Sequence, residues 1–300
     1  MNASSRQPRC WFIGPLAACA GLVARLPQPV LLAAGTILGG LLWPLLGKRR
    51  RYARINIDLC FPELDAAARR RMLRRNMRNT AIGLLEMVRA LYAPDKALAG
   101  LYEVEGLHHL QAAVASGRGV MLYGGHFPFY ELALRLLGHA FGQRMSLMAR
   151  RNNNACIEAL MNGARRQVFA HVIDKKGVHE LLDVLGGGGV VLYLADQNFT
   201  YQSAFVPFFG VPASTLTATP SLAQRADAVV LPFWFHRDEE GRYRLRIEAT
   251  WPGWPSGDLT ADAARCMAGL EAAVREKPDQ YLWIHRRFKT RPAGEAGVYR

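Results

Sequence analysis

The chain has 300 residues, half of them hydrophobic, and a formal net charge of +14. This length allows one large catalytic domain or two small ones, and the composition excludes a disordered chain. The positive charge favours a nucleic acid, an anionic membrane surface or an acidic protein or substrate as partner. The five cysteines have no CxxC spacing, and we interpret them as an unpaired set that favours a reducing compartment. They are Cys10, Cys19, Cys60, Cys156 and Cys266.

The most hydrophobic part of the chain is near its N-terminus. Residues 28–47 carry no charge, and this run is long enough to cross a bilayer as a helix. The basic residues 48–51 follow directly, and such a cluster favours the cytoplasmic side of a membrane. Basic residues before the run weaken this orientation, and three prolines leave a bent hairpin or an interfacial helix open. We predict a membrane anchor in residues 1–50 and a cytoplasm-facing domain in residues 51–300.

A long helix is predicted over residues 64–92, ending before Pro94. Its first half contains six arginines, which suit either contact with anionic lipid head groups or a solvated helix face. These are Arg69, Arg70, Arg71, Arg74, Arg75 and Arg78.

After this helix, short apolar runs alternate with helical patterns. Helices are predicted at 128–137 and 178–185, and an alternating pattern predicts an edge strand at 242–249. The other strands are predicted at residues 119–123, 190–194, 229–235 and 280–285. Such interleaving indicates an α/β fold with a central, largely parallel mixed sheet flanked by helices, whose functional residues lie where strands end.

The strongest local motif covers residues 124–131, Gly-Gly-His-Phe-Pro-Phe-Tyr-Glu. A buried strand ends in two glycines, His126 follows, and Pro128 suits the first turn of a helix. His126 is therefore expected just outside the helix, with its ring folded back towards the carboxylate of Glu131. A carboxylate on one imidazole nitrogen fixes the tautomer and leaves the other nitrogen as a base. The alternative is a structural histidine that caps local backbone.

A histidine base of this kind can take the proton from a substrate hydroxyl, which then attacks an acyl carbonyl directly. No Gly-x-Ser-x-Gly elbow is present and no cysteine has a comparable setting, so an enzyme nucleophile is not required. The paired glycines, Gly124 and Gly125, are expected to let the substrate approach the backbone closely.

The sequence resembles the lipid A secondary acyltransferases of the lauroyl and myristoyl type. These belong to the lysophospholipid acyltransferase superfamily, which has a His-x4-Asp/Glu motif. The resemblance extends from the anchor almost to the C-terminus, with Glu131 in the carboxylate position. It rests on residues 56–63, 125–131, 195–198, 205–210 and 280–292.

This resemblance implies transfer of a fatty acyl chain from acyl carrier protein to a hydroxyl of a 3-hydroxyacyl chain on a Kdo-bearing lipid A precursor. It implies a ternary mechanism without an acyl-enzyme, at the cytoplasmic side of the bacterial inner membrane, with His126 and Glu131 as catalytic residues. Arg165 or Arg166 would stabilise an oxyanion or a substrate phosphate. Asp196, with Gly125, would orient the site, although Asp196 also suits a loop cap.

The basic C-terminal run is expected to contact acyl carrier protein or lipid head groups, which are acidic. It comprises Arg286, Arg287, Lys289 and Arg291. Nucleic acid is not expected as a partner, because zinc spacing, a helix-turn-helix signature and aromatic–basic interleaving are missing. No metal or other cofactor is expected, since the adjacent His108 and His109 lack supporting ligand spacing.

Two other functions compete with this interpretation. One is a glycerolipid or other glycolipid acyltransferase of the same superfamily, although such enzymes usually have aspartate in place of Glu131. The other is a non-catalytic basic module that binds membranes, against which the intact pair of His126 and Glu131 argues.

Overall fold

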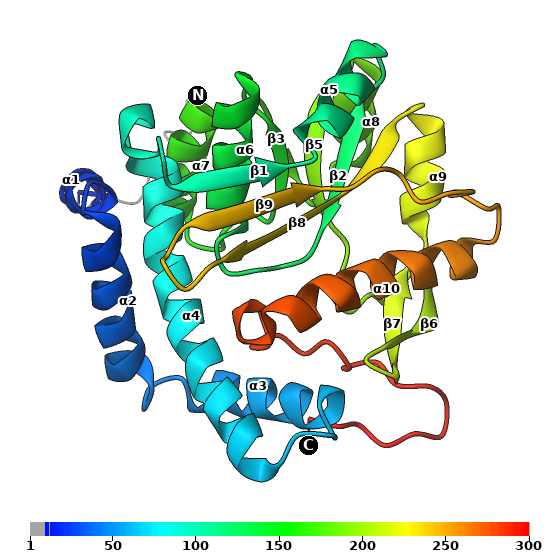
Figure 1. The fold of residues 1–300 in the computed structure, drawn as a ribbon, viewed down its shortest axis with the longest axis horizontal. Helices are drawn as coiled ribbons and strands as arrows, with labels where there is room; N and C mark the ends of the chain where they lie inside the picture. Colours follow the sequence, from blue (N-terminus) through cyan, green and yellow to red (C-terminus); the bar gives the residue numbers. More distant parts are fainter. Residues whose placement is uncertain (1–9, 12, 300) are drawn as a thin grey trace, which may run out of the picture.

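The computed structural model describes residues 10, 11 and 13–299, which form an α/β fold around one large sheet (Figure 1). Within these residues seven strands pair in the order β1-β9-β8-β2-β5-β3-β4. All neighbours are parallel apart from β8 and β9, which are antiparallel. The predicted fold class, a largely parallel mixed sheet flanked by helices, is confirmed. The strands are β1 (Tyr102–Glu105), β2 (Val120–Gly124), β3 (Ser146–Ala149), β4 (Val172–Asp174), β5 (Val190–Leu194), β8 (Val229–Arg237) and β9 (Tyr243–Ile247).

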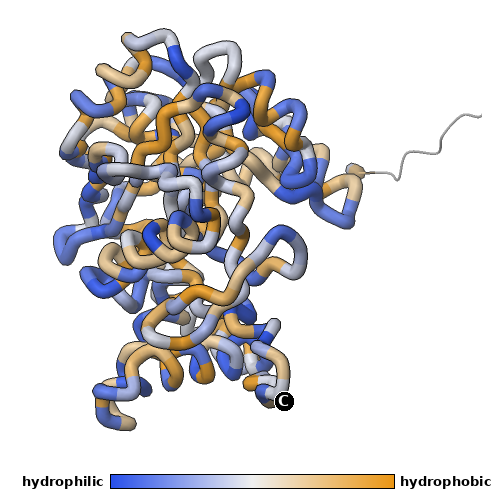
Figure 2. The backbone as a smooth tube through the Cα atoms, turned by 90° about the vertical axis from the view of Figure 1, so that its right-hand side faces the viewer, coloured by the Kyte–Doolittle hydropathy of each residue, from blue (hydrophilic) through white to orange (hydrophobic). Residues whose placement is uncertain are grey.

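The central strands form because their residues are apolar on both faces. Every residue of β2 is buried, and so are four of the five residues of β5. Continuous apolar runs of this kind are typical of parallel strands that are covered by helices on both sides. Figure 2 shows hydrophobic segments of the backbone gathered inside the upper part of the molecule.

Two strand predictions are wrong in detail. The alternating strand β9 is not at an edge, because β1, which we did not predict, pairs with it on the side away from β8. Residues 280–285 form no strand: η2 (Pro278–Gln280) leads into an irregular segment. Tyr281 and Trp283 are buried in that segment, and this alternation imitates the pattern of a half-buried strand.

Helices connect the strands, and the predicted helices at 128–137 and 178–185 are confirmed as α6 and α8. A two-stranded antiparallel hairpin of β6 (Ser203–Phe208) and β7 (Val211–Leu216) stands apart from the large sheet. The helices of this part are α5 (Leu107–Ala115), α6 (Tyr130–Phe141), α7 (Ala155–Val168), α8 (Val178–Gly186), α9 (Ala218–Arg225) and α10 (Leu259–Glu276).

The N-terminal part is helical and lies against α4. Helix α4 confirms the long helix predicted over 64–92. Asp65 caps α4 by accepting a hydrogen bond from the Ala68 N–H at 2.6 Å. The buried guanidinium of Arg89 donates to the Leu26 carbonyl and to Gln28, and so fixes the start of α2. The elements are α1 (Ile13–Ala24), α2 (Gln28–Leu42), α3 (Gly47–Cys60), α4 (Ala66–Tyr92) and η1 (Asp95–Ala97).

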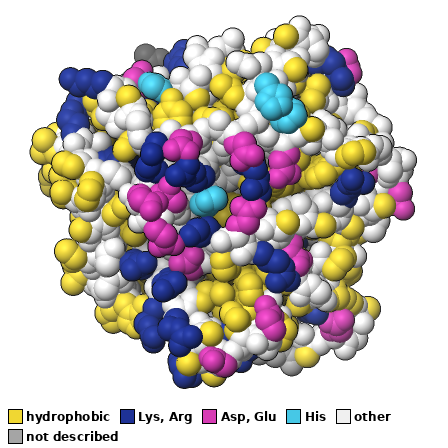
Figure 3. Space-filling view, viewed as in Figure 1, with side chains coloured by type: hydrophobic (Ala, Val, Ile, Leu, Met, Phe, Trp, Pro, Cys, Tyr) yellow, Lys and Arg dark blue, Asp and Glu magenta, His cyan; other side chains and the backbone are white. Residues whose placement is uncertain are grey.

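The predicted transmembrane helix is not confirmed. In the described residues no single helix has both the length and the apolar character needed to cross a membrane, whereas α2 and α3 together meet that test as a pair bent by 103°. The segment from α1 to the start of α3, here called the N-terminal arm, has exposed apolar side chains. They are Leu22, Ile37, Leu41 and Leu45. Figure 3 shows hydrophobic side chains along the left edge, where α1 and α2 lie, beside a surface of mixed charge.

The expectation that all five cysteines are unpaired is wrong. Cys10 and Cys156 form a disulfide with a Cα–Cα distance of 5.6 Å, which joins the N-terminal end of the described chain to α7. Cys19, Cys60 and Cys266 are free thiols. Sequence spacing could not indicate this pair, because the two cysteines are 146 positions apart.

Close contact between α2 and α4 depends on Gly35. A Cβ atom at this position would lie 2.7 Å from the Ile82 Cα, whereas one at Gly40 would meet nothing within 4 Å. We expect Gly35→Ala to lower the free energy of unfolding by about 1–3 kcal/mol through overpacking. Gly40→Ala should be neutral or stabilising by up to about 1 kcal/mol through helix propensity. Thermal unfolding in detergent measures both, and equal melting temperatures of the two variants would contradict this role of Gly35.

Candidate active site

His126 and Asp196 lie together at one edge of the sheet. His126 follows β2 and Asp196 follows β5, and these strands are parallel neighbours, so their carboxyl ends meet. The His126 N–H donates to Asp196 Oδ2 at 2.8 Å, and the ring Nδ1 is hydrogen-bonded to Asp196 Oδ1. The His126 side chain is 19% exposed and that of Asp196 is fully buried. The carboxylate therefore holds both the backbone and the ring of the histidine.

Tyr281 fixes this carboxylate from the other side. Its hydroxyl donates to Asp196 Oδ2 at 2.6 Å, and the next residue, Leu282, donates its N–H to the His126 carbonyl at 3.0 Å. The sequence patterns did not point to a role for Tyr281. The available signal was its place in the distinctive block 280–292.

The protonation state of Asp196 follows from these contacts. Burial alone raises the pKa of the Asp196 carboxyl, but the charge of His126 and the hydrogen bonds from His126 and Tyr281 outweigh it, so that the pKa is held well below its ordinary value. An ionised carboxylate on Nδ1 keeps the ring proton there and leaves Nε2 to accept a proton. The pair can thus act as a general base.

Glu131 does not hold the His126 ring, and that part of the expectation is wrong. The Glu131 carboxylate lies in the first turn of α6 and pairs with Arg165 of α7, at 2.5 Å from Nη2 and 3.2 Å from Nε. Both side chains are at most 5% exposed. The helix begins at Tyr130 rather than at Pro128, so Glu131 points to α7 while the ring of His126 turns to the end of β5.

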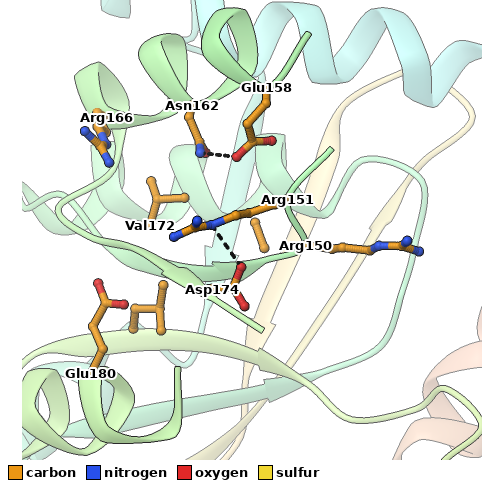
Figure 4. A pocket seen from close by; sticks show the side chains of 10 residues that line it. Arg150, Arg151, Glu158, Asn162, Arg166, Val172, Asp174 and Glu180 are labelled. Carbon is orange, nitrogen blue, oxygen red and sulfur yellow. Dashed lines mark hydrogen bonds and ion pairs between the residues drawn. The ribbon is translucent and has the colours of Figure 1, made fainter. Parts of the chain in front are cut away.

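The structure separates the two candidate arginines. Burial lowers the pKa of Arg165, but the hydrogen bond and charge of Glu131 outweigh burial, so its pKa is raised and the group stays charged. Arg165 Nη1 is buried without a hydrogen-bond partner among the described residues. Arg166 is exposed and lines a pocket of 330 Å³ instead (Figure 4). Adjacent residues on a helix point in directions about 100° apart, which explains the separation.

Gly125 also permits close packing within the protein. A Cβ atom there would lie 2.4 Å from Leu270 Cδ1 and 3.6 Å from Asp196 Oδ2. A side chain at this position would therefore require the Leu270 side chain of α10 to move.

The predicted surface role of Arg287 is wrong. Its side chain is 1% exposed, and it donates to the Ser214 carbonyl at 2.8 Å and to Thr215 Oγ1 at 2.5 Å. The guanidinium therefore joins the C-terminal segment to β7, where it cannot meet acyl carrier protein or a head group.

The other three basic residues of this segment differ in availability. Arg291 is mostly buried and donates to the Pro212 carbonyl at 2.7 Å and to Glu295 at 2.5 Å. Arg286 and Lys289 are exposed, with the Arg286 guanidinium 5.5 Å from the centre of the Tyr52 ring. Arg286 and Lys289 are thus free to contact an acidic partner.

The polar groups beside His126 suit the transfer of a proton. Within the described residues no three His, Cys, Asp or Glu side chains lie close enough together to hold a metal ion. Burial raises the pKa of the Cys60 and Cys266 thiols well above the ordinary value, so neither is a ready thiolate nucleophile. The arrangement suits deprotonation of a hydroxyl by His126.

The buried ion pair of Glu131 and Arg165 should couple the effects that substitutions of the two residues have on stability. Arg165→Met leaves a buried carboxylate without a partner and should lower the free energy of unfolding by about 3–5 kcal/mol. Adding Glu131→Gln removes that charge and should restore part of the loss. Thermal or denaturant unfolding of both singles and the double variant measures the coupling. A double variant as unstable as the sum of the singles would contradict it.

The buried imidazole of His285 should make the stability of the protein depend on pH. Burial lowers the pKa of His285 to about 4, and Nε2 has no hydrogen-bond partner among the described residues. Between pH 6.5 and 4 only the unfolded chain binds this proton. The free energy of unfolding therefore falls by up to about 3 kcal/mol as the pH is lowered through that range. His285→Gln lacks this loss, so its melting temperature should fall less than that of the wild type. Equal falls in the melting temperature of the wild type and of His285→Gln between pH 7 and 5 would contradict this prediction.

The chain is similar to known proteins over nearly its whole length. Residues 1–290 match the family described as bacterial lipid A biosynthesis acyltransferase. The lipid A biosynthesis palmitoleoyltransferase of Escherichia coli K12 is 34% identical over 295 residues, covering 97% of this chain and 95% of the relative. The lauroyltransferase of that strain is 33% identical over 296 residues (97% and 96%), and its myristoyltransferase is 27% identical over 309 residues (100% and 93%). The chain therefore belongs to the bacterial lipid A biosynthesis acyltransferase family and is an acyltransferase.

Proposed function

We propose that this acyltransferase moves a fatty acyl chain from an acyl carrier protein thioester to a hydroxyl of a 3-hydroxyacyl chain on a Kdo-bearing lipid A precursor. The observation that supports this most is the ionised Asp196 carboxylate on Nδ1 of His126, which leaves Nε2 as a base. The names of the relatives place their acyl transfer in lipid A biosynthesis.

The reaction needs no covalent enzyme intermediate. His126 Nε2 takes the proton of the acceptor hydroxyl while its oxygen attacks the thioester carbonyl. The tetrahedral intermediate then expels the thiolate, which takes the proton back from the imidazolium. The new ester bond replaces the thioester bond, and the histidine ends in its starting state.

Glu131 and Arg165 have a linked role in this proposal. The ion pair keeps the Arg165 guanidinium charged and fixed beside the first turn of α6, five residues beyond His126. The unpartnered Nη1 of Arg165 can donate to the oxyanion once substrate is bound. Glu131 thus acts through Arg165, whereas Asp196 orients the base.

The enzyme is proposed to work at the cytoplasmic side of the bacterial inner membrane. The exposed apolar side chains of α1 and α2 suit insertion into a bilayer, and the basic residues 48–51 at the start of α3 suit an anionic leaflet. Arg286 and Lys289 remain exposed for acyl carrier protein, which is acidic. In this proposal residues 1–50 form the membrane anchor and residues 51–300 form the catalytic part.

An assay in detergent micelles tests this function. Purified protein is mixed with a Kdo-bearing tetraacyl precursor and a panel of acyl carrier protein thioesters, and products are read by mass spectrometry. We expect a product heavier by one acyl chain, with the preferred thioester giving the chain length. His126→Ala should lower turnover by about 100- to 10,000-fold, and Asp196→Asn should lower it by at least about 100-fold, because both remove general-base catalysis.

His171→Ala is the matched control, since His171 is exposed and its side chain contacts no described residue through a hydrogen bond or ion pair. That variant should keep wild-type turnover. Near-normal turnover of His126→Ala would overturn the mechanism. Acylation of lysophospholipids but not of lipid A precursors would overturn the acceptor and favour the glycerolipid reaction.

A further inference from the structure

We infer that the pocket at the ends of β3 and β4 binds an anionic sugar unit of the acceptor, an inference that rests on the proposed function. This pocket has a volume of 330 Å³, at the small end of ligand pockets, which span about 300–1,000 Å³. Its lining comes from the ends of two strands, from α7 and from α8 (Figure 4). The charged and amide side chains in the lining are Arg150, Arg151, Glu158, Asn162, Arg166, Asp174 and Glu180.

The pocket opens at the same edge of the sheet as His126 and Asp196. Strand β3 is the neighbour of β5, which ends two residues before Asp196, and β4 follows β3. Strands are about 4.8 Å apart, so the ends of β3 and β4 lie roughly 5 and 10 Å to the side of the end of β5. Helix α7 connects the two places, because Arg165 faces Glu131 and Arg166 faces the pocket.

This separation matches the reach of the acceptor. The hydroxyl on the third carbon of the acyl chain is five bonds from the sugar ring, or about 6 Å at roughly 1.2 Å per bond of extended chain. With that hydroxyl at His126, the sugar or the unit attached to it reaches the ends of β3 and β4.

The mixed charges of the lining indicate the chemical class of the occupant. Three arginines and three carboxylates line the pocket, so a simple anion would meet repulsion as well as attraction. An acyl chain would strip water from these charges without replacing its hydrogen bonds. Sugar hydroxyls both donate and accept, so carboxylates and guanidinium groups can bind them together, and an arginine can also pair with a carboxylate or phosphate.

Some of these groups are already paired and others are free for a ligand. Arg151 reaches across the pocket to Asp174 at 3.3 Å, and Glu158 accepts from the Asn152 N–H at 2.6 Å. Arg166 and Glu180 form no side-chain hydrogen bond or ion pair with any residue in the described part of the chain. Figure 4 shows these two on opposite sides of one end of the pocket, with Arg151 between them. They form the part that is open to a sugar.

The test measures the KM for the acceptor in Arg166→Ala, Glu180→Gln and the double variant. We expect each single change to raise the KM of the Kdo-bearing precursor by about tenfold, as loss of a charge-assisted hydrogen bond does, with kcat and the KM of the thioester nearly unchanged. Arg225→Ala is the matched control: Arg225 is an exposed arginine at the end of α9 without a side-chain partner among the described residues.

Two truncated acceptors identify the anionic unit. If the variants lose their defect with a precursor that lacks the Kdo sugar, the sugar acid occupies the pocket. If they lose it with a precursor that keeps Kdo but lacks the phosphate of the adjacent glucosamine, the phosphorylated sugar occupies it. An unchanged KM for the full acceptor in the double variant would overturn the inference.

A binding measurement separates this inference from the proposed function. Full-length His126→Ala protein in detergent is titrated with the Kdo-bearing precursor, alone and combined with Arg166→Ala. A dissociation constant about tenfold weaker with Arg166→Ala supports the pocket even if turnover fails. A wild type that is inactive on every precursor sinks the proposed function, and equal dissociation constants sink the pocket.

Discussion

The buried carboxylate of Asp196 is the constraint on which the rest of the site depends. It accepts hydrogen bonds from the backbone and ring of His126 and from the Tyr281 hydroxyl, and so joins β2, β5 and the C-terminal segment. A buried charge is tolerated only when such partners surround it. The separate ion pair of Glu131 with Arg165 applies the same rule between α6 and α7. Two buried anions thus fix the five segments around the histidine.

Much of the fold could be predicted from the sequence, because periodicity reports burial. The fully apolar strands β2 and β5 and the helix α4 are found where the patterns placed them. The errors occur where burial alternates for a reason other than a half-covered sheet. Residues 280–285 alternate because Tyr281 and Trp283 insert into the core from an irregular segment. The position of β9 depends on pairing with β1, which is only four residues long and has no strong pattern.

The site could be predicted only in part, because local sequence marks the ends of strands but not their order in space. The glycine pair and His126 mark a strand end that local sequence reveals, and Asp196 marks the next one. Which carboxylate reaches the imidazole depends on the order of strands in space, and no local spacing gives that order. A basic run likewise looks uniform in sequence, although Arg287 is a buried link to β7 while Lys289 faces water. Charge on its own does not tell a structural guanidinium from a recruiting one.

The contact of Gly35 with Ile82 joins α2 to α4 without a flexible linker, and α4 in turn is bonded to the sheet through the buried Glu86 and Arg237. With 27 residues, α4 is a continuous helix about 40 Å long. Any surface that the N-terminal arm binds is therefore held at a fixed height and tilt relative to His126. In the proposed reaction, selection of an acceptor hydroxyl is then partly a matter of depth, because that hydroxyl must reach the level of the imidazole before it can react.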